Sequence, residues 1–127
     1  MYYRGREYCN VDVLKGKTLV SVDVSDDEIL FKTSDGEMYK MYHDQDCCEL
    51  VYIDDIVGDV QDLVGSEILM AEEVDGESPS DFNDKDHDSY TWTFYKFATI
   101  KGYVDIRWFG CSNGYYSESV SFCKMDV

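Results

Sequence analysis

Basic residues are scarce in this chain and are scattered along it. The 127 residues include 11 Lys and Arg against 27 Asp and Glu, which gives a formal net charge of −16. Nucleic-acid binding depends on cations that replace the counterions of the phosphates, so we do not expect this protein to bind DNA or RNA directly. The charge exceeds the roughly 2–8 charges that suit a small soluble domain, and it favours a partner with a basic surface.

Long hydrophobic runs are also absent. No stretch of about 18 apolar residues is present to form a membrane-spanning helix, and the N-terminal residues lack the apolar segment of a signal peptide. The cysteines number five, an odd count, and the adjacent Cys47 and Cys48 are awkwardly placed to bond each other. We therefore expect no membrane association and a reduced, cytoplasmic setting with free thiols.

Signatures of catalysis and of cofactor binding are missing as well. The sequence contains no glycine-rich phosphate loop, no G-x-S-x-G and no H-E-x-x-H motif. A cysteine nucleophile with a nearby base is conceivable only for Cys47 or Cys48 with His43 or His87, and nothing marks an oxyanion hole. We therefore expect a protein that is not an enzyme and that carries no cofactor.

What the chain has in abundance is aromatic and β-branched sequence. Hydrophobic residues make up 44% and aromatic residues 15% of the chain, which favours a packed, β-rich fold. Residues 17–43 predict a three-stranded meander with an Asp-Gly hairpin turn at 35–36. Residues 90–122 predict a second three-stranded meander that closes through an Asn-Gly turn at 113–114.

One short helix is predicted over residues 54–64. Five apolar residues would share one helical face, and these are Ile56, Val57, Val60, Leu63 and Val64. Two aspartates at the start suit the helix dipole, and Gly65 stands where a glycine commonly ends a helix.

The predicted fold class is therefore α+β, mostly antiparallel β-sheet in two three-stranded meanders with one short helix. Residues 1–127 are expected to form a single domain. Within it, residues 1–13 are expected to be a flexible N-terminal arm. Residues 75–88 are expected to be an acidic loop, because they lack periodicity and are rich in Asp.

Reactive side chains are densest in residues 43–49. Imidazole, thiolate and carboxylate groups are all metal ligands, so a metal site formed by His43, Asp46, Cys47 and Glu49 is one hypothesis. The spacing matches no standard zinc pattern. Two other interpretations stay open: a turn with buried cysteines and solvated acids, and a segment that contacts a partner.

Several stretches carry a resemblance to a known family. They are residues 41–49 (MYHDQDCCE), residues 90–97 (YTWTFYKF), and RWFG with SNGYYSESV between residues 107 and 120. These stretches resemble a family of small acidic proteins of bacteriophages and prophages that is catalogued mainly as a domain of unknown function. The resemblance covers about residues 14–122 and leaves the N-terminal arm outside. It implies a phage accessory protein in the bacterial cytoplasm and carries over no site residues.

The acidic residues and this resemblance together predict a phage anti-defence protein, such as an anti-CRISPR protein, that inhibits by binding. Duplex DNA presents one charge per roughly 1.7 Å, and an acidic surface could mimic DNA in the basic channel of a host effector. The residues expected to contact the partner are Asp54, Asp55, Asp59, Asp62, Glu72, Glu73, Asp84, Asp86, Asp88, Tyr115, Tyr116 and Glu118.

Two alternative functions remain. One is a module that sequesters a nucleotide-type immune signal by stacking on aromatic rings, and the candidate rings are Trp92, Tyr95, Trp108, Tyr115 and Tyr116. The other is a metal-binding protein that uses the residues of the 43–49 segment.

Overall fold

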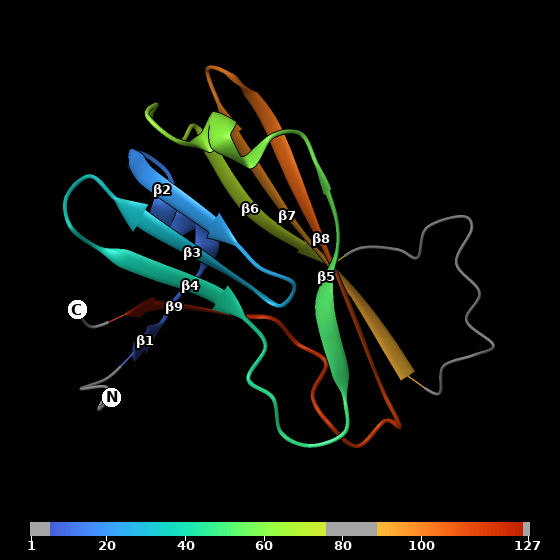
Figure 1. The fold of residues 1–127 in the computed structure, drawn as a ribbon. Helices are drawn as coiled ribbons and strands as arrows, with labels where there is room; N and C mark the ends of the chain where they lie inside the picture. The colour runs from blue at the N-terminus through green and yellow to red at the C-terminus, as the bar shows by residue number, and fades with distance from the viewer. Residues whose placement is uncertain (1–5, 76–88, 126–127) are drawn as a thin grey trace.

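The computed structural model describes residues 6–75 and 89–125, which form two antiparallel β-sheets that share one core (Figure 1). The first sheet has five strands in the order β1 (Arg6–Tyr8), β9 (Ser121–Met125), β4 (Met38–Tyr42), β3 (Glu28–Thr33) and β2 (Leu19–Val24). The second has four in the order β5 (Leu50–Val57), β8 (Gly102–Ser112), β7 (Ser89–Thr99) and β6 (Met70–Asp75). Short 3-10 helices η1 (Val11–Leu14) and η2 (Val60–Leu63) lie between strands.

The meander predicted over residues 17–43 is confirmed by β2, β3 and β4, which pair in sequence order. Gly36 in the second turn has φ +89°, a conformation that glycine adopts without steric cost. Beside this turn, Glu37 contacts Lys17 Nζ and Lys124 Nζ, each at 2.7 Å. This ion network joins the turn to the residues before β2 and to β9.

The predicted helix over residues 54–64 is wrong, and the described residues contain no α-helix, so the fold is mostly antiparallel sheet and not α+β. Residues 50–57 form β5, which contains a β-bulge between Ile53 and Asp55. A bulge adds one residue to the strand, so Ile53 and Ile56 both face the core although they are three residues apart. The bulged strand therefore places apolar residues three positions apart on one face, as a helix would.

The predicted second meander is only partly confirmed. β7 and β8 form the expected hairpin, but residues 115–122 do not pair with β8, whose other neighbour is β5. The chain instead crosses to the five-stranded sheet, where β9 pairs with β4 and β1. Phe122 explains the crossing. Its ring stacks on the ring of Tyr39 with the two centroids 5.6 Å apart, and both residues belong to the five-stranded sheet.

The N-terminal segment is more ordered than predicted. Residues 6–8 form β1 against β9, which corrects the expectation of a flexible arm for this part. In η1, Val11 and Leu14 are buried in the core. The first five residues and the predicted acidic loop from residue 76 onward lie outside the described residues.

The core lies between the two sheets and is rich in aromatic rings. The Phe31 ring of β3 lies 5.9 Å from the Phe97 ring of β7 and 5.9 Å from the Phe122 ring of β9. Trp108 of β8 is 1% exposed and directs its Nε1 toward Met41 Sδ of β4 at 3.2 Å. Contacts between the sheets are therefore formed by side chains that are far apart in the sequence.

We predict that Phe31→Ala lowers the free energy of unfolding by about 3–5 kcal/mol, the usual cost of truncating a buried phenylalanine. Phe31 is fully buried, whereas Ile100 is 85% exposed, so Ile100→Ala should change stability by less than about 0.5 kcal/mol. Urea unfolding followed by tryptophan fluorescence measures both. Equal effects of the two substitutions would contradict the packing described here.

Candidate partner-binding surfaces

The four aspartates assigned to the predicted helix lie on a strand and a 3-10 helix. Asp54 and Asp55 are exposed near the end of β5. Asp59 caps η2, because its Oδ1 accepts the Gln61 N–H at 2.9 Å. Asp62 lies in η2 itself and is partly exposed. All four aspartates nevertheless lie within one short surface segment, residues 54–62.

The turn between β2 and β3 brings further aspartates to this segment. The Ile53 N–H of β5 donates to the Asp26 carbonyl at 3.1 Å, and the Gln61 side chain donates to the Val22 carbonyl at 3.4 Å. Exposed carboxylates from two distant parts of the sequence therefore line one edge of the molecule. We call this the acidic edge, and it consists of Asp23, Asp26, Asp27, Asp54, Asp55, Asp59 and Asp62.

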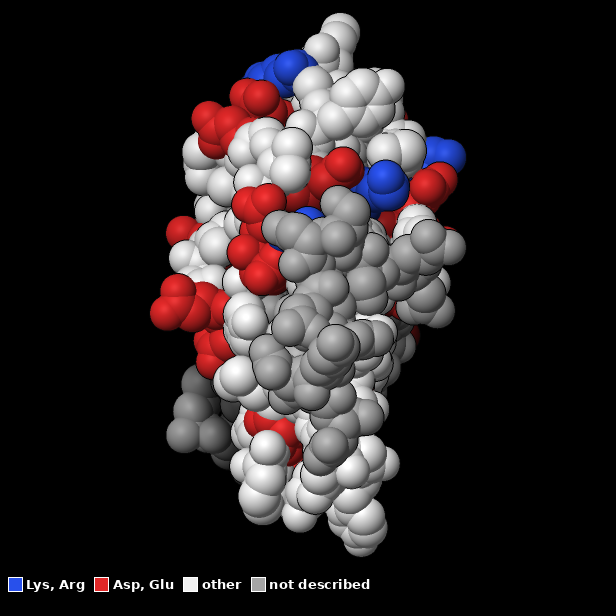
Figure 2. Space-filling view, turned by 90° about the vertical axis from the view of Figure 1, so that its right-hand side faces the viewer, with Lys and Arg blue, Asp and Glu red and all other residues white. Residues whose placement is uncertain are grey.

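Asp26 and Asp27 lie within the predicted 17–43 meander, and no local pattern in the sequence indicates that this meander meets residues 53–62. Figure 2 shows that acidic side chains outnumber basic ones on the face that it presents.

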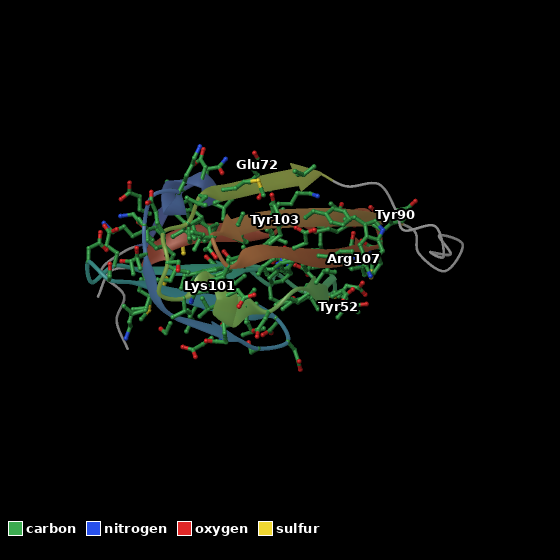
Figure 3. The ribbon with its side chains drawn as sticks, turned by 90° about the horizontal axis from the view of Figure 1, so that it is seen from above. Tyr52, Glu72, Tyr90, Lys101, Tyr103 and Arg107 are labelled. Carbon is green, nitrogen blue, oxygen red and sulfur yellow. A yellow bond between two sulfur atoms is a disulfide. The ribbon has the colours of Figure 1, made fainter. Side chains whose placement is uncertain are left out.

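Arg107 is a cation that contacts the acidic edge. Its Nη2 and Nε lie 2.6 and 2.8 Å from Asp54 Oδ2, and Nη2 lies 4.0 Å from Asp55. The guanidinium also stacks 5.3 Å above the Trp92 ring. Arg107 therefore neutralises only one end of the acidic edge. Lys101 is directed elsewhere, because its Nζ donates to the Val64 carbonyl at 2.5 Å (Figure 3).

Aromatic rings gather on the outer face of the four-stranded sheet (Figure 3). The Phe109 ring lies 5.8 Å from Tyr52 and 4.6 Å from Trp92. Of the rings proposed for base stacking, Tyr95 and Trp108 are buried in the core and Trp92 is only 6% exposed, so none of the three presents an open face to a ligand. This removes much of the support for a nucleotide-sequestering surface.

The predicted contact residues of β6 are separated from the acidic edge. Glu72 and Glu73 belong to one edge strand of the sheet, whereas β5 is the other. Glu72 lies opposite Lys96 in the register, and Glu73 accepts the Tyr95 hydroxyl at 2.7 Å. The predicted contacts Asp84, Asp86 and Asp88 lie outside the described residues.

The predicted residues between β8 and β9 have divergent roles. Tyr115 is 82% exposed, and its ring lies edge-on to Tyr116 at 5.0 Å. Glu118, in contrast, is buried and accepts hydrogen bonds from Thr91 Oγ1 at 2.8 Å and Ser112 Oγ at 2.5 Å. Glu118 therefore fastens the connection to the β7–β8 hairpin and is not available to a partner.

The 43–49 segment is held together by one buried carboxylate. Glu49 accepts the backbone N–H groups of Asp46 and Cys47, both at 2.9 Å, and the Gln45 side chain at 3.2 Å. His43 Nε2 lies 2.7 Å from Glu49 Oε2, and its Nδ1 lies 2.7 Å from the Ser119 carbonyl. Burial alone would raise the pKa of Glu49, but these donors outweigh it and hold the pKa at about 2.

Two consequences follow for the chemistry of this segment. His43 engages both ring nitrogens in these contacts, so neither nitrogen is open to a metal unless one contact breaks. No group of three or more His, Cys, Asp or Glu residues able to hold a metal is found among the described residues. The residues of the predicted metal site, His43, Asp46, Cys47 and Glu49, are engaged in the hydrogen bonds of this segment and in the Cys47–Cys48 disulfide.

The cysteines differ from the prediction in one respect. The structure joins Cys47 and Cys48 in a disulfide, which corrects the expectation of free thiols, and both residues are exposed, unlike in the interpretation of this segment as a turn with buried cysteines. Cys9 and Cys111 are free thiols, and the buried Cys123 directs its Sγ toward Met125 Sδ at 3.5 Å. Cys111 lies on β8 and Cys123 on β9, in different sheets, because the chain crosses between the sheets after β8.

The fold and its surfaces define a two-sheet antiparallel β protein with an acidic edge and without an assembled metal site in its described part. The family model for a domain of unknown function (DUF7448) matches residues 12–122, and the chain belongs to that family. No curated protein and no solved structure gave a match. No helix in the described ranges is long and apolar enough to span a membrane.

We predict that Glu49→Gln destabilises the fold in a pH-dependent way. Because the folded-state pKa of Glu49 lies below its ordinary value of 4.5, the ionised carboxylate stabilises the fold above about pH 4.5, and this stabilisation is lost as the pH falls towards about 2. The difference in melting temperature between the wild type and Glu49→Gln should thus be largest near neutral pH and shrink across that range.

Thermal melts followed by circular dichroism at a series of pH values measure this difference. Glu72→Gln is the matched control, since it removes the same charge from an exposed position. A difference for Glu49→Gln that stays constant with pH would show that the carboxylate does not anchor the segment.

Proposed function

We propose that this protein is a non-enzymatic, phage-encoded inhibitor that occupies the basic nucleic-acid-binding surface of a host defence protein. The observation that carries the proposal is the acidic edge, where the aspartate-bearing segments of the β2–β3 turn, β5 and η2 lie next to one another. Basic channels are built to receive one negative charge per roughly 1.7 Å of duplex. A surface with several carboxylates offers such a channel negative charge in place of phosphates.

The rigidity of the acidic edge supports this function. The Asp26 carbonyl is bonded to β5 and Asp59 caps η2, so the carboxylates are mounted on ordered backbone. A preorganised surface loses less conformational entropy on binding than a disordered acidic tail. The net charge of −16 adds a long-range field that steers the protein toward cationic surfaces.

We propose no catalytic role, because the candidate base His43 is already engaged in hydrogen bonds. Both ring nitrogens of His43 are engaged, and its side chain is 4% exposed. It is therefore not placed to act as a base for Cys47. The resemblance to phage and prophage proteins supports the setting in the bacterial cytoplasm, and a defence nuclease is the partner class that fits an acidic inhibitor there.

The test compares two charge-reversed variants in a competition assay. D26K/D27K alters the acidic edge, and D44K/D46K alters exposed acids of the 43–49 segment by the same net charge. Purified RNA-guided defence nucleases are titrated with the protein in the presence of labelled duplex DNA. We expect the wild type to displace DNA and D26K/D27K to be weakened by at least about tenfold, because like charges across an interface cost several kcal/mol.

The D44K/D46K variant should inhibit nearly as well as the wild type, and inhibition by the wild type should weaken as salt increases. Circular dichroism confirms that both variants are folded. Equal weakening of the two variants would contradict the role of the acidic edge. Failure to displace DNA from any nuclease at low salt would overturn the proposed function.

A further inference from the structure

Cys47 and Cys48 differ from the other described cysteines in exposure. Both are exposed at the outer part of the segment between β4 and β5. Cys123 is fully buried, and burial raises the pKa of the Cys9 and Cys111 thiols. Since thiolate formation and access control the reactivity of cysteine, the sulfurs at positions 47 and 48 are the ones that a soluble thiol reagent reaches first.

The backbone around this pair is held without help from the sulfurs. Glu49 accepts the Asp46 and Cys47 N–H groups, and Gln45 Nε2 donates to the Cys47 and Glu49 carbonyls at 3.2 and 2.8 Å. His43 ties the same segment to the β8–β9 connection, and Figure 1 shows these two loops side by side. The S–S bond can therefore open while both sulfurs stay adjacent.

We propose that Cys47 and Cys48 form a reversible dithiol–disulfide site that exchanges with soluble thiols and, when reduced, chelates thiophilic trivalent arsenic. This proposal does not rest on the proposed function. Exposed disulfides are the labile ones in proteins. The chemical class of ligand is a small electrophile that takes two thiolate ligands from one short segment.

A soluble dithiol is the reductant in this exchange. One of its thiolates attacks Sγ of Cys47 or Cys48, the S–S bond breaks, and a mixed disulfide forms. The second thiol of the reductant then displaces the cysteine, so two electrons and two protons pass to the pair and the reductant leaves as a cyclic disulfide. An arsonous acid, R–As(OH)2, then forms two As–S bonds with the reduced pair, and its two hydroxyl groups leave as water with the two thiol protons.

The first experiment is native-state alkylation of the full chain with iodoacetamide, read by intact mass and peptide mapping. Without reductant, we expect no label at Cys47 or Cys48. After treatment with dithiothreitol and its removal, we expect a label on each, while the buried Cys123 stays unlabelled. Labelling of the pair before reduction, or no labelling after it, would overturn the proposal.

The second experiment uses phenylarsine oxide as the probe on reduced protein. One equivalent should protect both Cys47 and Cys48 from alkylation, and C47S or C48S should each abolish that protection. C111S is the matched control and should keep it, because Cys111 is partly buried on β8. Protection that survives C47S would place the arsenical elsewhere and contradict the proposal.

A third measurement separates the site from a general unfolding of the segment. Amide hydrogen exchange at residues 46 and 47, whose N–H groups donate to Glu49, should stay unchanged on reduction, as should exchange in β4 and β8. Exchange that quickens throughout the β4–β5 segment and the β8–β9 connection would show that the disulfide holds the loop, contrary to the proposal.

Discussion

The packing of aromatic rings between the two sheets is the interaction on which the rest of the structure depends. Phe31 contacts Phe97 from the opposite sheet and Phe122 from its own, so one ring joins three strands that lie far apart in the sequence. Burial of such rings is the main favourable contribution to folding. Because Phe122 belongs to this core, the chain must leave β8 and cross to the other sheet, and the crossing sets the position of the loops.

Two buried carboxylates make that crossing compatible with a folded state. A carboxylate is costly to bury unless donors surround it, and both Glu49 and Glu118 meet this condition in different ways. Glu49 gathers backbone N–H groups and His43, whereas Glu118 accepts two hydroxyl groups from β7 and β8. Acidic residues that look alike in the sequence therefore divide into internal anchors and exposed surface charges.

The exposed charges concentrate where they also protect the fold. β5 is an edge strand, and an edge strand invites pairing with other chains unless charge or a bulge blunts it. The bulge between Ile53 and Asp55 and the carboxylates beside it serve that purpose. The same carboxylates, joined by those of the β2–β3 turn, form the acidic edge. Arg107 offsets part of their repulsion and holds Asp54 against the sheet.

The sequence by itself determined the charge, the β-rich composition, the first meander and the β7–β8 hairpin, because these depend on composition, on period-two alternation and on local turns. It could not distinguish a bulged strand from a helix over residues 54–57, since a bulge also places apolar residues three apart. Only the tertiary structure decided that β9 joins the sheet that does not contain β8, and that Glu49 and Glu118 are buried. It also decided that residues 23–27 lie beside residues 53–62. The physical reason is that these features arise from side chains that meet across the core, and no local pattern encodes their distance.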